Sequence, residues 1–158
     1  MEFWDIYDAD KKPTGRTMKR NDWCLKDGEY HLTVLGVVAR PDKTFLITKR
    51  VMTKAWAPGW WEVSGGAAQA GESSYDAVLR EVKEETGLDV SGAQGGYLFT
   101  YKRENPGEGD NYFVDCLPLC DGCERRRSTP SGRRDRRPHV CHSESDQGIC
   151  SPGKIPAL

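Results

Sequence analysis

The chain has 158 residues, of which 37% are hydrophobic and 30% charged, and its mean hydropathy is −0.70. This length suits a single domain with one hydrophobic core. No apolar run approaches the roughly 20 residues that a membrane span needs, and the acidic, aromatic start lacks the layout of a signal peptide. With 23 Lys and Arg against 24 Asp and Glu, the net charge of −1 gives no general attraction to nucleic acid or anionic lipid. We therefore expect a cytoplasmic protein without a membrane or nucleic-acid partner, and its oligomeric state stays open.

The composition changes close to residue 118. All aromatic residues lie at or before Phe113, whereas 120–158 contains seven Arg and one Lys against five acidic residues and has no helical or alternating periodicity. Such a segment buries too little apolar surface to offset the entropy of ordering it. We predict a folded domain over 1–118, with an N-terminal hairpin in 1–28. The tail over 119–158 is expected to be disordered or the product of a shifted reading frame.

Runs of β-branched and aromatic residues predict the strands. In chain order the expected strands are 4–7, 14–19, 31–39, 44–48, 60–63, 96–102 and 111–117. The first two, the next two and the last two are each joined by a stretch rich in turn residues, so we expect three hairpins.

One helix is expected between Ser73 and Gly87. Ser73 can cap its start with Asp76 as the acidic partner of a capping box, and Gly87 stands where a left-handed C-terminal cap belongs. At 3.6 residues per turn, one stripe of the helix faces the core. That stripe consists of Tyr75, Val78, Leu79, Val82 and Thr86.

Three carboxylates, Glu81, Glu84 and Glu85, are expected on the side of this helix away from the stripe. Like charges at these spacings repel one another, and a bound cation would remove the repulsion. Carboxylate oxygens are the ligands that Mg²⁺ and Mn²⁺ prefer. Taken alone, the three residues favour a merely solvated helix face, which is common on surface helices.

The surrounding spacing favours the metal site. From Gly66 to Leu88 the sequence satisfies G-x5-E-x7-R-E-U-x-E-E-x-G-U at every specified position, where U is apolar. This pattern resembles the Nudix box of the Nudix hydrolase superfamily. With the strand order around it, the resemblance covers about 28–118. The N-terminal part is similar to that of Nudix members related to isopentenyl-diphosphate isomerase.

The resemblance implies an α/β (α+β) fold, a mixed β-sheet sandwich with one catalytic loop–helix–loop. It also leads us to expect a C-terminal helix after the last strand. The tail sequence shows no helical pattern, so we expect that helix to be missing. The implied activity is hydrolysis of the diphosphate bond of a nucleoside diphosphate linked to another moiety, with Mg²⁺ or Mn²⁺ as cofactor. Which substrate is cleaved and how many ions are bound stay open.

Roles are carried over by position in the motif. Glu81 and Glu85 are the implied principal metal ligands, Glu84 is a further ligand or the base, and the carbonyl of Gly66 is an additional candidate ligand. Glu84 and Glu85 are therefore also candidate catalytic residues. Glu72 and Arg80 are the implied pair that holds the loop and orients the carboxylates, since an arginine fork suits a bidentate carboxylate contact.

Two other functions were weighed. The related isomerases use a catalytic cysteine near the strand before the box, and 61–64 contains none, which disfavours isomerase activity. The tail carries candidate zinc ligands, but the segment 124–138 between them offers no hydrophobic or aromatic residues to form a small zinc-stapled core. These candidates are Cys120, Cys123, His139, Cys141 and His142. The competing hypothesis is thus a non-catalytic or truncated Nudix domain with a zinc- or nucleic-acid-binding tail.

Overall fold

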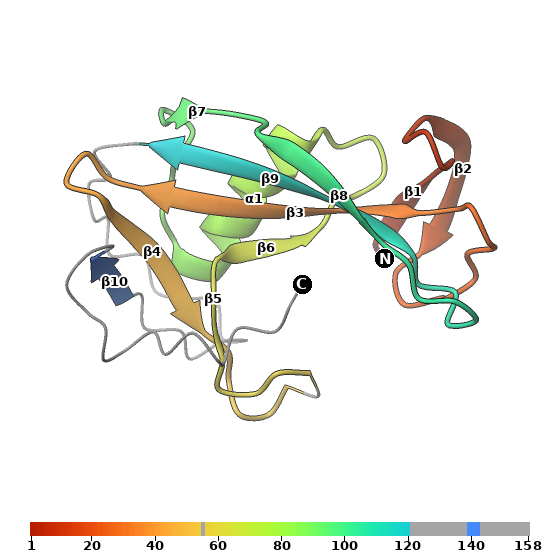
Figure 1. Ribbon diagram of the computed structural model, residues 1–158, viewed down its shortest axis with the longest axis horizontal. Helices are drawn as coiled ribbons and strands as arrows, with labels where there is room; N and C mark the ends of the chain where they lie inside the picture. The colour runs from red at the N-terminus through yellow and green to blue at the C-terminus, as the bar shows by residue number, and fades with distance from the viewer. Residues whose placement is uncertain (55, 121–138, 143–158) are drawn as a thin grey trace.

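The computed structural model describes residues 1–54, 56–120 and 139–142 (Figure 1). Its strands are β1 (Phe3–Tyr7), β2 (Pro13–Lys19), β3 (His31–Ala39), β4 (Thr44–Lys49), β5 (Trp61–Glu62), β6 (Ser64–Ala67), β7 (Gln94–Gly95), β8 (Phe99–Arg103), β9 (Tyr112–Cys120) and β10 (His139–His142). Within these ranges there is one helix, α1 (Ser74–Thr86). No helix in the described ranges is long and apolar enough to cross a membrane.

The central sheet is mixed and is built around β3. This strand pairs in parallel with β9 on one side and antiparallel with β6 and β4 on the other. β7 and β8 both pair antiparallel with β9, and β10 and β5 pair antiparallel with β4. The hairpin β1–β2 forms a separate two-stranded sheet at one end of the molecule, and α1 lies across the central sheet (Figure 1). The predicted α+β fold class is confirmed.

The three predicted hairpins are present, and two strands are found that the sequence did not predict. The run expected at 60–63 contains only β5, which pairs with β4, and the unpredicted β6 follows it and pairs with β3. The run expected at 96–102 corresponds to β8, and the short unpredicted β7 precedes it. Periodicity alone does not show such a change of partner, since neighbouring segments remain extended.

The predicted tail, 119–158, lies mostly outside the described residues. β9 runs through Cys120, two residues beyond the expected boundary, and β10 adds a strand beside β4 with His139 opposite Ile47. The side chains of β10 and the position of Cys123 are outside the description. The zinc hypothesis and the expected nature of the tail therefore stay predictions.

Local signals set the ends of α1. Ser73 is the N-cap, and its hydroxyl accepts from the backbone N–H of Asp76 at 3.1 Å. Gly87 adopts the left-handed conformation with φ of 75° and donates its N–H to the carbonyl of Lys83 at 2.9 Å. Both predicted caps are confirmed.

The expected apolar stripe of α1 packs on the sheet. Val78 and Val82 are fully buried, and Tyr75 and Leu79 are half-buried against the same core. Burial of such a face, more than helix propensity, stabilises a helix of this length. The largest fully buried side chains opposite it come from β3 and β9 and are Val34, Leu117 and Leu119.

The direction of α1 over the sheet follows from one row of paired residues. Gly66 on β6, Val34 on β3 and Asp115 on β9 are in register and share a face. The hydroxyl of Ser74, the first residue of α1, donates to Asp115 at 2.5 Å, while Gly66 lies against the side chain of Glu81. The helix therefore begins over β9 and crosses β3 to reach β6 near its middle, which brings its glutamates to the β6 edge.

A buried ion pair attaches the N-terminal hairpin to this layer. Asp115 is only 2% exposed, and its carboxylate accepts from Lys11 in the β1–β2 turn, from Thr100 on β8 and from Ser74. A buried carboxylate is tolerated when it is paired and its lone pairs are satisfied. Lys11 and Asp115 are 104 positions apart, so the pair closes a very long loop of chain.

Replacing Lys11 with Met should lower the free energy of unfolding by about 2–4 kcal/mol, because Asp115 would keep its burial and lose its counter-charge. The measurement is urea unfolding at neutral pH. Lys12→Met is the matched control, since the Lys12 side chain is 73% exposed and lies 3.7 Å from Asp10, and it should cost less than about 0.5 kcal/mol. Equal losses in the two variants would contradict the structural role of the buried pair.

Candidate active site

Arg80 is the centre of the site. Its Nε and Nη2 donate to the two oxygens of Glu72 at 2.8 and 2.9 Å, the predicted bidentate pair. Nη1 donates to Oε1 of Glu81 at 2.7 Å, and Nη2 also donates to the carbonyl of Ala67 at 3.1 Å. One planar guanidinium thus joins the loop, the helix and the end of β6.

These contacts have an electrostatic consequence. The pKa of the Arg80 guanidinium is raised above its ordinary value, chiefly by the hydrogen bonds to Glu72 and also by the bond to Glu81, against an opposing effect of burial. The side chain is only 21% exposed and stays charged. Its positive charge therefore offsets the cost of holding carboxylates in a partly buried site.

The three glutamates are not equivalent, which corrects the prediction that all lie on the side of α1 away from the core. Glu81 and Glu85 are buried, at 9% and 5% exposure, whereas the side chain of Glu84 is 58% exposed. The physical reason is the crossing of α1 over β6, where the strand presents a glycine. Because Gly66 has no side chain, the carboxylate of Glu81 fits beside the strand. Any larger residue at position 66 would fill that space.

Gly66 makes that space. A Cβ at this position would lie 2.5 to 2.8 Å from the carboxyl atoms of Glu81, closer than real contacts allow. The backbone of β6 therefore lies directly against the Glu81 carboxylate. This is the close approach of backbone to a functional group for which glycine is suited.

The loop before α1 is organised by Glu72. The backbone N–H of Gln69 donates to Oε2 of Glu72 at 2.9 Å, and the N–H of Glu72 donates to the carbonyl of Gln69 at 3.0 Å. Gly71 adopts a φ of 79°, which few other residues tolerate. Its N–H donates to Asp5 of β1, a contact that the motif does not predict.

The donor set suits a hard divalent cation. Glu81, Glu84, Glu85 and the carbonyl of Gly66 offer oxygen ligands only, and the cradle under Glu81 would be filled by a Cβ. Within the described part of the chain, no three His, Cys, Asp or Glu side chains already form a metal cluster. Instead, Nη1 of Arg80 lies 2.7 Å from Glu81 and 3.6 Å from Glu84. Glu84, whose side chain is open to solvent, is thus held less closely by Arg80 than Glu81 is.

Arg50 directly follows β4, and its side chain is held by several contacts. Its Nη1 lies 2.9 Å from Glu62, its Nε donates to the carbonyl of Trp56 at 3.0 Å, and its guanidinium stands 5.1 Å from the Trp56 ring centre. The side chain is 18% exposed. Arg50 and Glu62 meet because β4 and β5 pair with each other, and such a contact leaves no spacing signal in the sequence.

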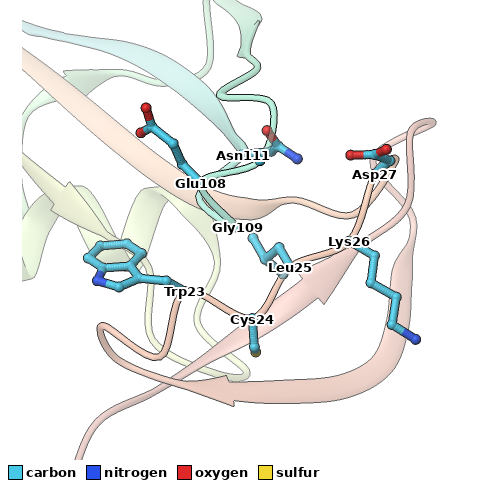
Figure 2. A pocket seen from close by; sticks show the side chains of 9 residues that line it. Trp23, Cys24, Leu25, Lys26, Asp27, Glu108, Gly109 and Asn111 are labelled. Carbon is cyan, nitrogen blue, oxygen red and sulfur yellow. The ribbon is translucent and has the colours of Figure 1, made fainter.

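The described residues also surround a separate hollow of about 360 Å³, shown in Figure 2. It lies between the segment after β2 and the loop joining β8 to β9, with Trp23, Asp27 and Glu108 in its wall. None of its lining residues belongs to α1 or β6. The carboxylates of α1 therefore do not face this hollow.

Comparison with known proteins agrees with this geometry. The family model of the NUDIX domain matches residues 29–132, and the chain belongs to this family of hydrolases, which generally use divalent metal ions. An uncharacterized Nudix hydrolase of Listeria monocytogenes is 33% identical over 117 residues, covering 72% of this chain and 67% of that protein. An isopentenyl-diphosphate Delta-isomerase of Escherichia coli is 30% identical over 103 residues, covering 64% of this chain and 56% of that protein.

Solved structures show the same fold. The DR0079 protein of Deinococcus radiodurans matches with a TM-score of 0.67 at 19% identity, covering 98% of this chain and 91% of that chain. The MutT structure from a study of Aliivibrio salmonicida and Vibrio cholerae matches with a TM-score of 0.55 at 21% identity, covering 80% and 86%. The resemblance stated from the motif is thereby confirmed at the level of family and fold.

Replacing Arg80 with Lys should lower the free energy of unfolding by about 1–3 kcal/mol, because one ammonium cannot reproduce the paired bonds to Glu72 and also reach Glu81 and Ala67. Chemical unfolding measures the loss. Arg16→Lys is the control, since Arg16 makes one exposed contact with Glu29 and should change stability by about 0.5 kcal/mol or less. Similar losses would argue against Arg80 as the centre of the site.

Proposed function

We propose that this protein is a divalent-metal-dependent Nudix pyrophosphohydrolase that cleaves the diphosphate bond of a nucleoside diphosphate linked to another moiety. The observation that carries the proposal is the burial of two carboxylates of α1, Glu81 and Glu85. Such burial is costly for a merely solvated helix face, even though Glu81 lies against the Gly66 backbone and accepts a hydrogen bond from Arg80. It is expected where a cation completes the site.

Each residue then has a distinct part in the reaction. Glu81 and Glu85 would hold Mg²⁺ or Mn²⁺, with the Gly66 carbonyl and Glu84 as further oxygen ligands. When bound, the cation supplies charge that neutralises the diphosphate oxygens and lowers the pKa of water. Glu84 is the carboxylate that solvent reaches, so it is the candidate to accept a proton from the attacking water. A bond forms between the water oxygen and phosphorus, and the bridging P–O bond breaks to release a phosphate group.

Arg80 and Glu72 contribute through orientation. Because Glu72 takes two donors of Arg80, the remaining Nη1 is aimed at Glu81. A carboxylate oriented before substrate arrives costs less reorganisation in the transition state. We propose Glu72 and Arg80 as positioning residues of the catalytic loop.

Isomerase activity, the function named for the Escherichia coli relative, is the second candidate. The related isomerases need a cysteine near the strand before the box, and β5 and β6 contain none. The cysteines of the described ranges are Cys24, Cys116, Cys120 and Cys141, and none of them lies on β5, β6 or α1. Hydrolysis is therefore favoured.

One screen separates these functions. The purified chain is incubated with Mg²⁺ and nucleotide sugars, ADP-ribose, dinucleoside polyphosphates or oxidised nucleotides, and phosphate-containing products are quantified. Isopentenyl diphosphate is assayed in parallel for double-bond migration. Turnover that is abolished by EDTA and restored by Mg²⁺ supports the proposal. A folded protein inactive on every hydrolase substrate would favour the non-catalytic alternative.

Glu85→Gln should reduce metal-dependent hydrolysis at least about 100-fold and weaken Mn²⁺ binding about 10–100-fold, since the amide removes the charged ligand. The unfolding midpoint should stay close to that of wild type, because a neutral isostere replaces a buried charge. Mn²⁺ binding is followed by electron paramagnetic resonance. Asp22→Asn, which removes an exposed carboxylate, is the control for charge. Unchanged turnover in Glu85→Gln would refute its assigned role.

Gly66→Ala tests the cradle directly. The new Cβ must displace the Glu81 carboxylate, which Arg80 holds at 2.7 Å, so Mn²⁺ affinity should fall about tenfold or more. A titration followed by calorimetry gives the affinity, and circular dichroism verifies that the helix remains. Wild-type affinity in this variant would show that the backbone of β6 is not part of the metal site.

A further inference from the structure

We propose that Asp5, on the N-terminal hairpin, is a positioning residue that orders the catalytic loop 69–72. Its catalytic role rests on the proposed function, whereas the contact itself is present in the structure. The N–H of Gly71 donates to Oδ2 of Asp5 at 2.7 Å, and the N–H of Ala70 donates to the carbonyl of Phe3 at 2.8 Å. Both acceptors lie on β1, outside the segment 29–132 that the family model matches.

The packing of the hairpin brings Asp5 to the loop. Trp4 and Ile6 are buried in a small apolar cluster with Met18 and Leu25, and Ala67 of β6 packs against this cluster. Because side chains alternate along a strand, Asp5 projects from the other side of β1 between these two anchors. The carboxylate is thus held beside the loop by apolar contacts that are independent of it.

Hydrogen bonds of two neighbouring residues, Glu72 and Arg80, connect Gly71 to the glutamates of α1. Glu72 follows Gly71 directly and is folded back on the loop by the N–H of Gln69. Glu72 then accepts two hydrogen bonds from Arg80, which in turn donates to Glu81. A shift of the loop therefore moves Glu72, and with it the donor that orients Glu81.

The far end of the same hairpin is held at the start of α1. Lys11, in the β1–β2 turn, pairs with Asp115, and Asp115 also accepts from Ser74, the first helical residue. The hairpin consequently contacts the loop at Gly71 and reaches the first turn of α1 through Asp115. The hairpin is therefore connected both to the loop that precedes α1 and to the first turn of α1.

The contact between Asp5 and Gly71 is open to solvent, which separates positioning from folding. In an Asp5→Ala variant, water can hydrogen-bond to the freed N–H, so the overall stability should change little. The loop would nevertheless lose a charge-assisted hydrogen bond and gain freedom. Displacement of a catalytic group by about 1 Å is enough to slow a reaction substantially.

The experiment compares Asp5→Ala, Asp5→Asn and Asp10→Ala in the full chain. Asp10 lies on the same hairpin, and its side chain is 78% exposed, so Asp10→Ala is the matched control. Hydrogen exchange of the Ala70 and Gly71 amides is measured by NMR without substrate or metal. Steady-state kcat and KM are measured on the substrate found in the screen.

We expect Asp5→Ala to accelerate Gly71 exchange at least about tenfold and to lower kcat about tenfold with KM within about twofold. Asp5→Asn, which keeps an acceptor oxygen, should restore part of both, and Asp10→Ala should match wild type. Wild-type Gly71 exchange in Asp5→Ala would overturn the proposal, as would faster exchange with an unchanged kcat. If Asp5→Ala fails to fold, the same comparisons apply to Asp5→Asn.

The exchange measurement also separates this inference from the proposed function. A wild-type chain without hydrolase activity would refute the proposed function. The Gly71 amide would still report whether Asp5 orders the loop: faster exchange in Asp5→Ala supports that role, and unchanged exchange refutes it.

Discussion

The hydrogen bonds of the Arg80 guanidinium are the interactions on which the rest of the site depends. Four donated bonds join Glu72 in the loop, Glu81 on α1 and the Ala67 carbonyl on β6. Only a planar side chain with several rigidly spaced donors can serve three segments at once. The same charge allows carboxylates to be partly buried, so the geometry of the site and its electrostatics have a single origin.

The position of α1 on the sheet places the hydrogen bonds of Arg80 and the glutamates of α1 together, and this is the candidate active site. The helix begins over Asp115 and reaches β6 at Gly66, where the strand offers backbone and no side chain. Val78 and Val82 provide the apolar contact with the sheet, and Glu81 and Glu85 are buried next to them. A helix face of this mixed character is stable only because Arg80 and the exposed backbone of β6 lie beside the carboxylates.

The N-terminal hairpin extends the site beyond the motif. Its apolar cluster packs on Ala67, its backbone and Asp5 accept from the loop, and Lys11 reaches the buried Asp115. The hairpin residues of these contacts lie outside the segment that the family model matches, whereas their partners lie inside it. In this chain, the loop before α1 and the hairpin are therefore directly connected.

Local patterns in the sequence were sufficient for much of this protein. The caps Ser73 and Gly87, the buried stripe of α1 and the three hairpins follow from spacings of a few residues, because neighbours on one turn or one strand are set by local geometry. The Glu72–Arg80 pair was implied by the resemblance to the Nudix box. The burial of Glu81 and Glu85, the separation of β5 from β6, and the contacts Asp5–Gly71 and Lys11–Asp115 depended on tertiary packing. They arise where segments meet that are between 14 positions (Thr48 and Glu62) and 104 positions (Lys11 and Asp115) apart, and the side chain that one segment presents to another is not encoded in the periodicity of either.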